Sequence, residues 1–342
     1  MKPTERFAAY ISGLPVDRAP MIEWAPWWGL TVDRWHSEGL PDTVESTADI
    51  QSYFGLDRCL QTCVSPFTEA TPSPEGFGSG IMKSEDDYIN KILPTLFPSP
   101  ENLFPKQRLL DIKAELAKGE AIHFFTASGF FWYPRELFGI ESHLFSFYDQ
   151  PGLYTRICDD YCEWLERVFR HVFSICRFDF MTFAEDMSYN NGPMLSKVMF
   201  DKFLAPYYKK LITVIHEYSI PVIIDSDGDI TLAVDWYAEV GADGMLPLER
   251  QAGVDVSLYV EKQPGMIYIG HFDKMCMKYG EEAMRNEFER IFPSMCVGKV
   301  IPSVDHQTPP DVSLDNYKIY VSLMKEYSEK AGEYRRRNLF SL

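Results

Sequence analysis

Long apolar segments are missing from this sequence. No run of 18 or more apolar residues occurs in it, so no transmembrane helix is expected. The N-terminal stretch MKPTERFAAYISGLPVDRAP also lacks a long apolar core and is typical of an amphipathic helix rather than a secretory signal. We therefore expect a cytoplasmic protein that does not bind membranes.

Positive charge is scarce. The chain has 33 Lys and Arg residues against 50 Asp and Glu residues, which gives a formal net charge of −17. Nucleic acids and anionic lipid surfaces are therefore poor partners, since both are polyanions. A polyanionic small-molecule substrate is disfavoured too, unless arginines gather around it.

Cysteine pairs and glycine-rich turns of diagnostic spacing are also lacking. The seven cysteines include no CxxC pair, and their odd number fits reduced, buried thiols better than a disulfide framework. No GxGxxG turn follows a predicted strand, which disfavours a doubly wound dinucleotide-binding fold.

What the sequence does contain is an alternation of short apolar runs and helical segments. Such alternation predicts βαβ units and a parallel sheet. Eight strands, the number of a closed TIM-type (β/α)8 barrel, are predicted at residues 20–24, 59–63, 121–127, 178–186, 221–227, 241–249, 265–273 and 298–306. We expect one α/β domain over residues 1–342, with an N-terminal extension and a long Pro-rich excursion around residues 64–105.

The stretch PVIIDSDGDI places three carboxylates directly after an apolar run, at Asp225, Asp227 and Asp229. It is not a calcium EF-hand loop, because glycine stands at the fourth position and Trp236 at the twelfth. Asp229 precedes a helical segment and is expected to be its N-cap. Asp225 and Asp227 lie at the carboxyl end of a predicted strand, which is the catalytic face of a barrel.

Other predicted strands end in similar groups. These strand-end residues are Glu23 and Trp24, Glu185 and Asp186, Glu249, His271 and Asp273, and Asp305 and His306. Carboxylates that converge in one mouth raise one another's pKa unless a cation lies between them. The site is thus expected either to hold protons as general acids or to bind a metal through oxygen and imidazole ligands. Hydrogen bonding to loop backbone is the alternative role for His271 and for His306.

Aromatic residues are abundant, at 15% of the chain, and two clusters lie near predicted strand ends. The first, EWAPWWG, contains Trp24, Trp27 and Trp28, and the second, FFTASGFFWY, contains Trp132. Aromatic side chains beside a catalytic mouth can stack on a flat ligand. Packing of loops onto the barrel rim is the alternative.

Several blocks resemble the uroporphyrinogen decarboxylase superfamily, which also contains corrinoid-linked methyltransferases and is similar in fold to cobalamin-independent methionine synthase. The resemblance runs from about Pro20 to the C-terminal helix and is clearest in DSDGDI, GADGMLPLERQAGVDV, YIGHFDK and IPSVDHQTPPDVSLDNY. It implies a TIM-type barrel, which agrees with the strand count.

The chain departs from both branches of that superfamily. Uroporphyrinogen decarboxylases carry Arg-Gln-Ala-Gly-Arg after the first strand, whereas this chain has MIEWAPWWG, without arginine. The zinc methyltransferases carry His-x-Cys where this chain has Asp225-x-Asp227, and a later Cys where it has Asp305 and His306. Thiolates suit zinc that activates a thiol, so the remaining oxygen-rich set points to the methyl-donor side of corrinoid chemistry.

These observations together predict a methyltransferase that demethylates a small methylated substrate, such as a methoxy-aromatic compound, for a separate corrinoid protein. A divalent metal such as zinc is the expected cofactor. The alternatives are a uroporphyrinogen decarboxylase and a non-catalytic tetrapyrrole or corrinoid binder. The expected catalytic residues are Asp225, Asp227, Asp305 and His306 with Glu185 in support; the expected substrate wall is Glu23, Trp24, Trp27, Trp28 and Trp132; and the expected metal ligands are Asp227, Glu249 and His271.

Overall fold

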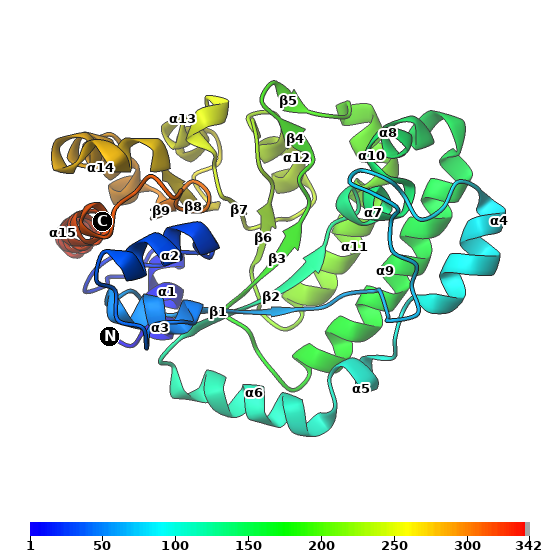
Figure 1. Ribbon diagram of the computed structural model, residues 1–342, viewed down its shortest axis with the longest axis horizontal. Helices are drawn as coiled ribbons and strands as arrows, with labels where there is room; N and C mark the ends of the chain where they lie inside the picture. Colours follow the sequence, from blue (N-terminus) through cyan, green and yellow to red (C-terminus); the bar gives the residue numbers. More distant parts are fainter. Residues whose placement is uncertain (339–342) are drawn as a thin grey trace.

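The computed structural model describes residues 1–338 and contains a curled parallel sheet of seven strands (Figure 1). The strand order is β1-β2-β3-β6-β7-β8-β9, so strands adjacent in this sheet follow one another along the chain. The strand bounds are β1 Cys59–Cys63, β2 Ile122–Ser128, β3 Phe180–Ala184, β6 Val222–Asp225, β7 Gly244–Leu246, β8 Ile267–Phe272 and β9 Lys299–Val304, and a separate hairpin is formed by β4 Ser188–Tyr189 and β5 Gly192–Pro193.

Helices cover the outside of the sheet and both ends of the chain lie on the same side of the molecule (Figure 1). The longer helices are α1 Pro3–Ile11, α2 Gly29–Ser37, α3 Thr47–Tyr53, α6 Lys106–Lys118, α7 Trp132–Phe138, α8 Ile140–Asp149, α9 Pro151–Phe173, α10 Lys197–Phe203, α11 Ala205–His216, α12 Ala233–Glu239, α13 Val256–Lys262, α14 Glu281–Val297 and α15 Leu314–Asn338. Short helical turns are α4 Glu85–Asp87, η1 Tyr88–Ile92, η2 Leu93–Thr95, α5 Pro100–Leu103, η3 Arg250–Ala252 and η4 Lys274–Tyr279.

The sequence pattern explains these elements. Strands inside the sheet are buried along their length, as β8 shows, because helices cover the outer face of the curled sheet and side chains fill its inner face. In α9, the buried positions Leu153, Ile157, Tyr161 and Leu165 recur every four residues, which puts them on one helix face. Apolar burial on both sides of the sheet thus places the core between the strands and the surrounding helices.

The strand expected at residues 20–24 is absent from the paired strands of the described chain, so closure into a complete eight-stranded barrel is not shown. The segment nevertheless lies between the two sheet edges. The Asp57 amide, just before β1, donates to the Met21 carbonyl at 2.8 Å, and the carboxylate of Glu23 accepts from the Ser303 hydroxyl of β9 at 2.9 Å. Side-chain bonds here take the place of a backbone ladder, a difference that the apolar pattern of residues 20–24 does not carry.

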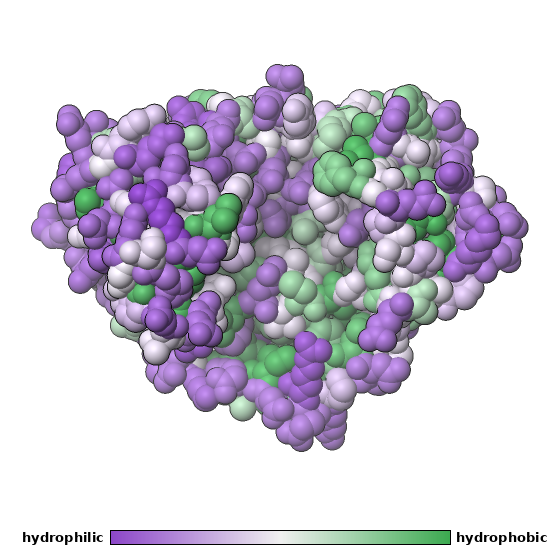
Figure 2. Space-filling model, in the orientation of Figure 1, coloured by the Kyte–Doolittle hydropathy of each residue, from purple (hydrophilic) through white to green (hydrophobic). Residues whose placement is uncertain are grey.

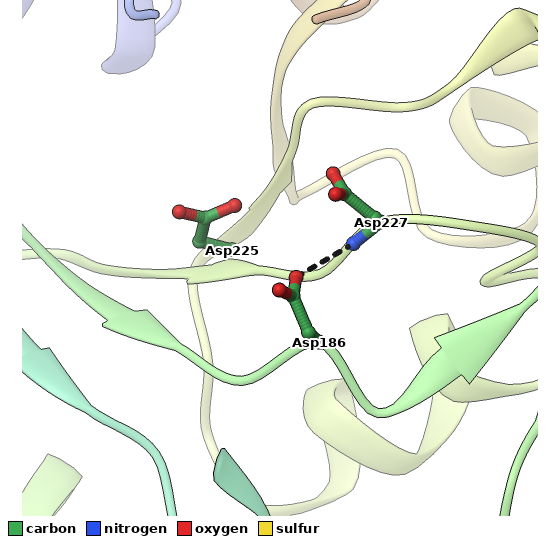
Figure 3. A group of neighbouring side chains, drawn as sticks. All are labelled: Asp186, Asp225 and Asp227. Atoms are coloured by element: carbon green, nitrogen blue, oxygen red, sulfur yellow. Dashed lines mark hydrogen bonds between the residues drawn. The ribbon is translucent and has the colours of Figure 1, made fainter. Parts of the chain in front are cut away.

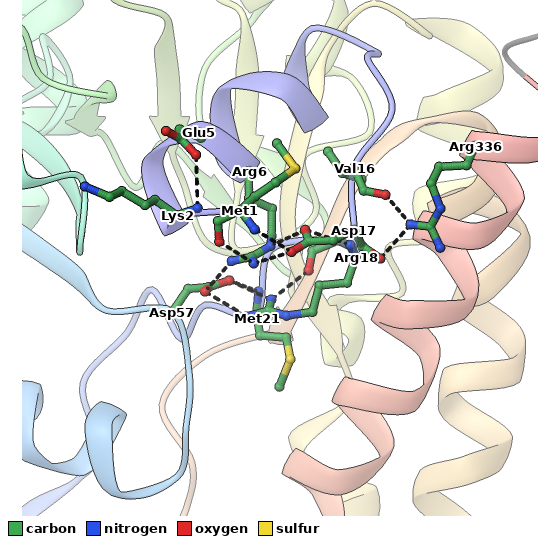
Figure 4. A network of polar contacts seen from close by, with 11 residues as sticks. Met1, Lys2, Glu5, Arg6, Val16, Asp17, Arg18, Met21, Asp57 and Arg336 are labelled. Atoms are coloured by element: carbon green, nitrogen blue, oxygen red, sulfur yellow. Dashed lines mark hydrogen bonds and ion pairs between the residues drawn. The ribbon is translucent and has the colours of Figure 1, made fainter.

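A buried ionic network holds this N-terminal segment in place (Figure 4). Arg6 of α1 binds Asp17 through two nitrogens, both at 2.7 Å, and Asp57 at 2.9 Å. Asp57 is 4% exposed and also accepts two bonds from Arg18, at 2.7 and 2.8 Å, and one from the Met21 amide at 2.9 Å. Four donors therefore compensate the burial of this carboxylate.

The excursion at residues 64–105 is packed against the helices beside the carboxyl ends of the strands. Phe97 contacts the ring of Trp164 in α9, with ring centroids 5.6 Å apart, and the Trp164 indole donates to the Pro98 carbonyl at 2.8 Å. Gly80 lies so close to α7 that an added Cβ would come within 2.2 Å of the Phe138 carbonyl. Phe97 of the excursion thus serves packing, whereas Phe77 is exposed.

Two helix predictions need correction. The sequence SKVMFDKFLAPYYKKLITVIHEY, residues 196–218, predicts one continuous helix. The structure divides it into α10 and α11 at Leu204, just before Pro206, which has no N–H to continue the helical ladder. Asp229 is not the N-cap of α12, which begins at Ala233. Its carboxylate instead accepts from the Thr231 amide at 2.9 Å, so it stabilises the turn that precedes the helix. Within residues 1–338, no helix is long and apolar enough to span a bilayer.

Candidate active site

Three carboxylates meet where β3 and β6 end (Figure 3). Asp225 ends β6, Asp227 follows two residues later, and Asp186 follows β3. One oxygen of each lies within 4.8 Å of the others, and all three side chains are partly exposed. The adjacent parallel pairing of β3 with β6 brings these residues to one edge of the sheet, as their strand-end positions predict.

The local backbone directs these side chains toward one another. The Asp225 carbonyl accepts from the amides of both Glu185, at 2.8 Å, and Asp186, at 3.4 Å. Asp186 has φ of +39°, an uncommon conformation for a residue with a side chain, and its carboxylate accepts from the Asp227 amide at 3.3 Å. Glu249, after β7, accepts from the Gly228 amide at 2.9 Å and so holds the same loop from the other side.

Burial and mutual repulsion shift the proton affinity of this acid cluster. Burial raises the pKa of Asp225 well above its ordinary value, and the charges of Asp186 and Asp227 raise it further. Burial, followed by repulsion from Asp186 and Glu249, raises the pKa of Asp227 to about 7. The cluster can therefore donate a proton near neutrality, or a divalent cation can compensate three ionised carboxylates.

A lysine and a histidine flank the acid cluster. Lys274, the first residue of η4, is 12% exposed and lies with Nζ 3.2 Å from the Asp305 carboxylate. Asp305 is fully buried and also accepts from the Arg250 amide at 3.0 Å, so it positions Lys274. His306 has its Nε2 3.6 Å from Asp227 Oδ2, and burial, with a contribution from Lys274, lowers its pKa. Lys274 was not predicted as a site residue, because the strand-end pattern consists of Asp, Glu and His and Lys274 lies one residue beyond the predicted strand.

Glu185, expected to support catalysis, is fully buried behind the acid cluster. Its Oε2 accepts from the Phe131 amide at 3.0 Å, at the start of α7. The backbone of Gly129 approaches so closely that an added Cβ would lie 1.7 Å from this oxygen. Burial raises the pKa of Glu185 to about 8, although the Tyr208 hydroxyl and the backbone bonds oppose the shift. The residue thus supports the α7 N-terminus rather than facing the mouth.

We expect stability to depend on pH through Glu185. Its pKa is raised from 4.5 to about 8 in the folded chain, so the folded state retains a proton that the unfolded chain loses. The resulting stabilisation is fully present below pH about 4.5 and is lost as pH rises toward 8, on the order of 5 kcal/mol in all. Glu185→Gln mimics the protonated form. The free energy of unfolding of this variant, measured with urea, should rise relative to that of the wild type between pH 5 and 8. A difference between the two proteins that stays constant with pH would contradict the raised pKa.

The three residues expected as metal ligands are not brought together. His271 is fully buried, its Nδ1 lies 3.2 Å from the Leu248 carbonyl, and its Nε2 faces the Val256 amide at 3.1 Å and Arg290 at 2.8 Å. Both ring nitrogens thus have protein partners, and burial together with Arg290 lowers the pKa of His271 to about 4. His271 thus bonds to loop backbone, which was the alternative role given for it. Asp186, rather than His271, lies beside Asp227.

The expected substrate wall is also dispersed. Trp24 contacts the His306 ring edge-on, with centroids 6.3 Å apart, and Trp132 stacks against Arg135, 4.7 Å from its guanidinium carbon. Trp27 instead is buried against Trp35 and Tyr317.

Two more members of that wall are placed differently from the prediction. Trp28 is 45% exposed and immediately precedes α2. Glu23 is 2% exposed and accepts from the Tyr320 hydroxyl at 2.5 Å, so its carboxylate joins α15 to the sheet edge. Proximity along EWAPWWG did not imply a shared face, because the segment turns into α2.

A cavity of about 340 Å³ opens beside the acid cluster. It is lined by Phe131, Arg135, Ile140, His143, Leu144, Asp186, Ser188, Tyr189, Met194 and Asp227. A larger cavity of about 660 Å³ lies between the excursion and α7, and Arg135 and Ile140 line both. Figure 2 shows the molecule hollowed between the lobe of its terminal helices and the lobe of α7–α9.

The donor set of the acid cluster fits a hard divalent cation. Asp186, Asp225 and Asp227 offer carboxylate oxygen alone, which suits magnesium, manganese or calcium, while zinc prefers nitrogen and sulfur ligands. The imidazole of His306, 3.6 Å from Asp227, would have to approach by movement of its side chain to complete a zinc site.

Comparisons with known proteins agree with this architecture. Residues 149–327, more than half of the chain, match the model of the uroporphyrinogen decarboxylase (URO-D) family. A methyltransferase from Methanosarcina mazei has a similar structure, with a TM-score of 0.65, 14% identity, and coverage of 96% of this chain and 99% of that one. A B12-independent methionine synthase from Shewanella sp. W3-18-1 is less similar, with a TM-score of 0.42, 12% identity and 68% coverage of each chain. No curated protein sequence matched.

The parallel α/β sheet with acidic strand ends, together with this family match, defines the class of protein. The chain belongs to the uroporphyrinogen decarboxylase family.

Proposed function

We propose that the protein is a methyltransferase that demethylates a small methyl ether and passes the methyl group to a corrinoid carried by a separate protein. The observation that carries this proposal is the acid cluster of Asp186, Asp225 and Asp227 at the carboxyl ends of β3 and β6. The fold shared with a methyltransferase supports it.

The charge around the site argues against uroporphyrinogen, after which the family is named, as the substrate of this protein. A decarboxylase must neutralise the carboxylates of uroporphyrinogen, for which arginine pairs are suited. Here the segment at residues 20–24 contributes the buried Glu23, and the strand ends contribute the acid cluster and Glu249. Cations near the site include Lys274, which already contacts Asp305, and Arg135, which lines the cavity beside the acid cluster. An octa-anionic ligand would be repelled.

The reaction proposed is the transfer of a methyl group from an ether oxygen to the cobalt of a reduced corrinoid, which supplies the electron pair of the new bond. The C–O bond of the ether breaks, the methyl group forms its new bond to cobalt, and the electron pair of the broken bond stays on oxygen. That oxygen becomes a hydroxyl group by taking one proton. Asp227, with its pKa raised to about 7, would donate the proton, and leaving-group protonation by such an acid typically contributes 10²–10⁴-fold in rate.

A divalent cation held by Asp186, Asp225 and Asp227 would supply Lewis-acid polarisation of the same oxygen. The two roles differ in what the carboxylates must carry: protons in one case, and negative charge in the other. Lys274 and His306 would orient the ether oxygen in either case, because both lie beside Asp227 or its neighbours.

The proposal is tested by incubating the protein anaerobically with 2-methoxyphenol and chemically reduced cobalamin, with and without manganese or zinc. We expect 1,2-dihydroxybenzene and methylcobalamin in equal amounts, measured by chromatography. A parallel incubation with uroporphyrinogen should give no coproporphyrinogen. Decarboxylation without ether cleavage would establish the second candidate, to which the family match points; a tightly bound coloured ligand without turnover would establish a non-catalytic binder.

A further inference from the structure

Unpaired polar atoms gather in the wall of the 340 Å³ cavity beside the acid cluster. Among residues 1–338, nine buried side-chain nitrogen or oxygen atoms have no hydrogen-bond partner. Three of the nine, both ring nitrogens of His143 and the hydroxyl of Ser188, belong to residues that line this one cavity. Buried polar groups are nearly always paired, since an unpaired one is destabilising, so their concentration here points to a ligand.

His143 lies on α8 and is fully buried. Its ring packs edge-on against Phe131, with centroids 4.4 Å apart, and close to Phe147, at 5.4 Å. Burial, with a contribution from Arg135, lowers its pKa to about 3. The imidazole is therefore neutral at physiological pH and offers one donor and one acceptor.

Ser188 belongs to the β4–β5 hairpin and is 5% exposed. The hairpin is fastened to the loop that carries Asp227, because the Asp229 amide donates to the Tyr189 carbonyl at 2.9 Å. Gly228 has φ of +79°, and an added Cβ would lie 2.9 Å from the Ser188 carbonyl carbon. This close approach keeps the Ser188 backbone at a fixed position relative to the acid cluster.

The other cavity residues indicate the remaining properties of the ligand. Phe131, Ile140, Leu144 and Met194 supply apolar walls, which suit a hydrocarbon ring. The cavity is lined by two carboxylates, Asp186 and Asp227, and by one cation, Arg135. Burial raises the pKa of Asp186, and the charge of Arg135 already opposes this rise by stabilising the ionised form. An anionic ligand is thus disfavoured. A cavity of about 150 Å³ accepts benzene, so 340 Å³ accommodates one substituted ring.

We infer that this cavity binds a neutral single-ring aromatic compound whose hydroxyl group bonds to Ser188 and His143 while its methylated oxygen faces Asp227. Ser188 and His143 are then specificity-determining residues. The inference rests on the proposed function for the identity of the reacting group, an ether methyl. The predicted binding of the aromatic ring does not depend on turnover, because it is argued from the unpaired atoms and the cavity alone.

Calorimetric titration with 2-methoxyphenol tests the inference. The wild type should bind this probe more tightly than methoxybenzene, which lacks the hydroxyl, and more tightly than the anionic 2-methoxybenzoate. Ser188→Ala and His143→Phe should each weaken 2-methoxyphenol binding by roughly 3–10-fold, the usual loss for one hydrogen bond. Neither substitution should change the affinity for methoxybenzene.

Thermal unfolding without ligand separates this role from a structural one. Ser188→Ala removes an unpaired hydroxyl, so its Tm should equal or exceed that of the wild type. Ser328→Ala is the matched control, since Ser328 in α15 also carries a buried, unpaired hydroxyl; it should preserve the Tm and leave binding unchanged.

The inference is overturned if the wild type fails to bind 2-methoxyphenol, if Ser188→Ala binds it equally well, or if Ser188→Ala lowers the Tm by several degrees. The proposed function fails separately, if 2-methoxyphenol binds through Ser188 but is not demethylated with reduced cobalamin. Demethylation that is insensitive to both substitutions would contradict this inference and leave the proposed function intact.

Discussion

Asp227→Asn should reduce methyl transfer by at least about 100-fold, because it removes either a proton donor or a cation ligand at the reacting oxygen. The measurement is the rate of 1,2-dihydroxybenzene release under anaerobic conditions, together with the metal content per chain by elemental analysis. Asparagine nearly preserves the shape of the side chain. The Asp227 amide bond to Asp186, at 3.3 Å, is also kept.

The pH dependence of the wild-type rate separates the two roles. If Asp227 acts as an acid, activity is full below its pKa of about 7 and is lost as pH rises through that value. If the cluster binds a cation, the carboxylates must ionise, and activity is lost as pH falls. In the second case Asp227→Asn also lowers bound metal.

Asp229→Asn is the matched control in the same loop. The Asp229 carboxylate accepts from the Thr231 amide at 2.9 Å and from its hydroxyl at 2.5 Å, and it is not part of the acid cluster. Its substitution should retain activity within about threefold, as expected for a bond that an asparagine oxygen can preserve. Equal activity of Asp227→Asn and the wild type would remove the acid cluster from the mechanism.

Asp57→Ala should lower the free energy of unfolding by about 3–5 kcal/mol, the usual result of removing one partner from a buried ion pair. Arg6, with a side chain 7% exposed, would lose one of its partners, and Arg18 would lose both of its bonds to this carboxylate. The Met21 amide would also lose its acceptor. Urea denaturation followed by circular dichroism measures the loss.

Asp311→Ala provides the comparison. Asp311 pairs with Lys278 at 2.9 Å, but the two side chains are 47% and 31% exposed. Exposed pairs contribute about 0–1 kcal/mol, because solvent screens them. Similar losses in Asp57→Ala and Asp311→Ala would show that the network at the N-terminus does not anchor the segment over residues 20–24.

Much of the fold and part of the site followed from local pattern. The apolar runs at β2, β3, β6, β7, β8 and β9 were recognisable because parallel strands are buried on both faces. The convergence of Asp186, Asp225 and Asp227 followed from a rule of connectivity, since the carboxyl ends of parallel strands meet at one edge. The hydrogen bonds at residues 20–24 were not predictable, because side chains from β9 and α15 make them.

The sequence by itself determined that acids gather at one edge of an α/β sheet. The tertiary structure decided which of them face one another. Glu185 and Asp186 are neighbours in the chain, yet Glu185 turns to the start of α7, and Asp186, at φ of +39°, turns to Asp227. Strand-end position specifies an edge, whereas side-chain direction depends on backbone conformation and on partners distant in sequence. For the same reason Ser188 and His143, which lie on a hairpin and a helix, were visible as binding residues only in three dimensions.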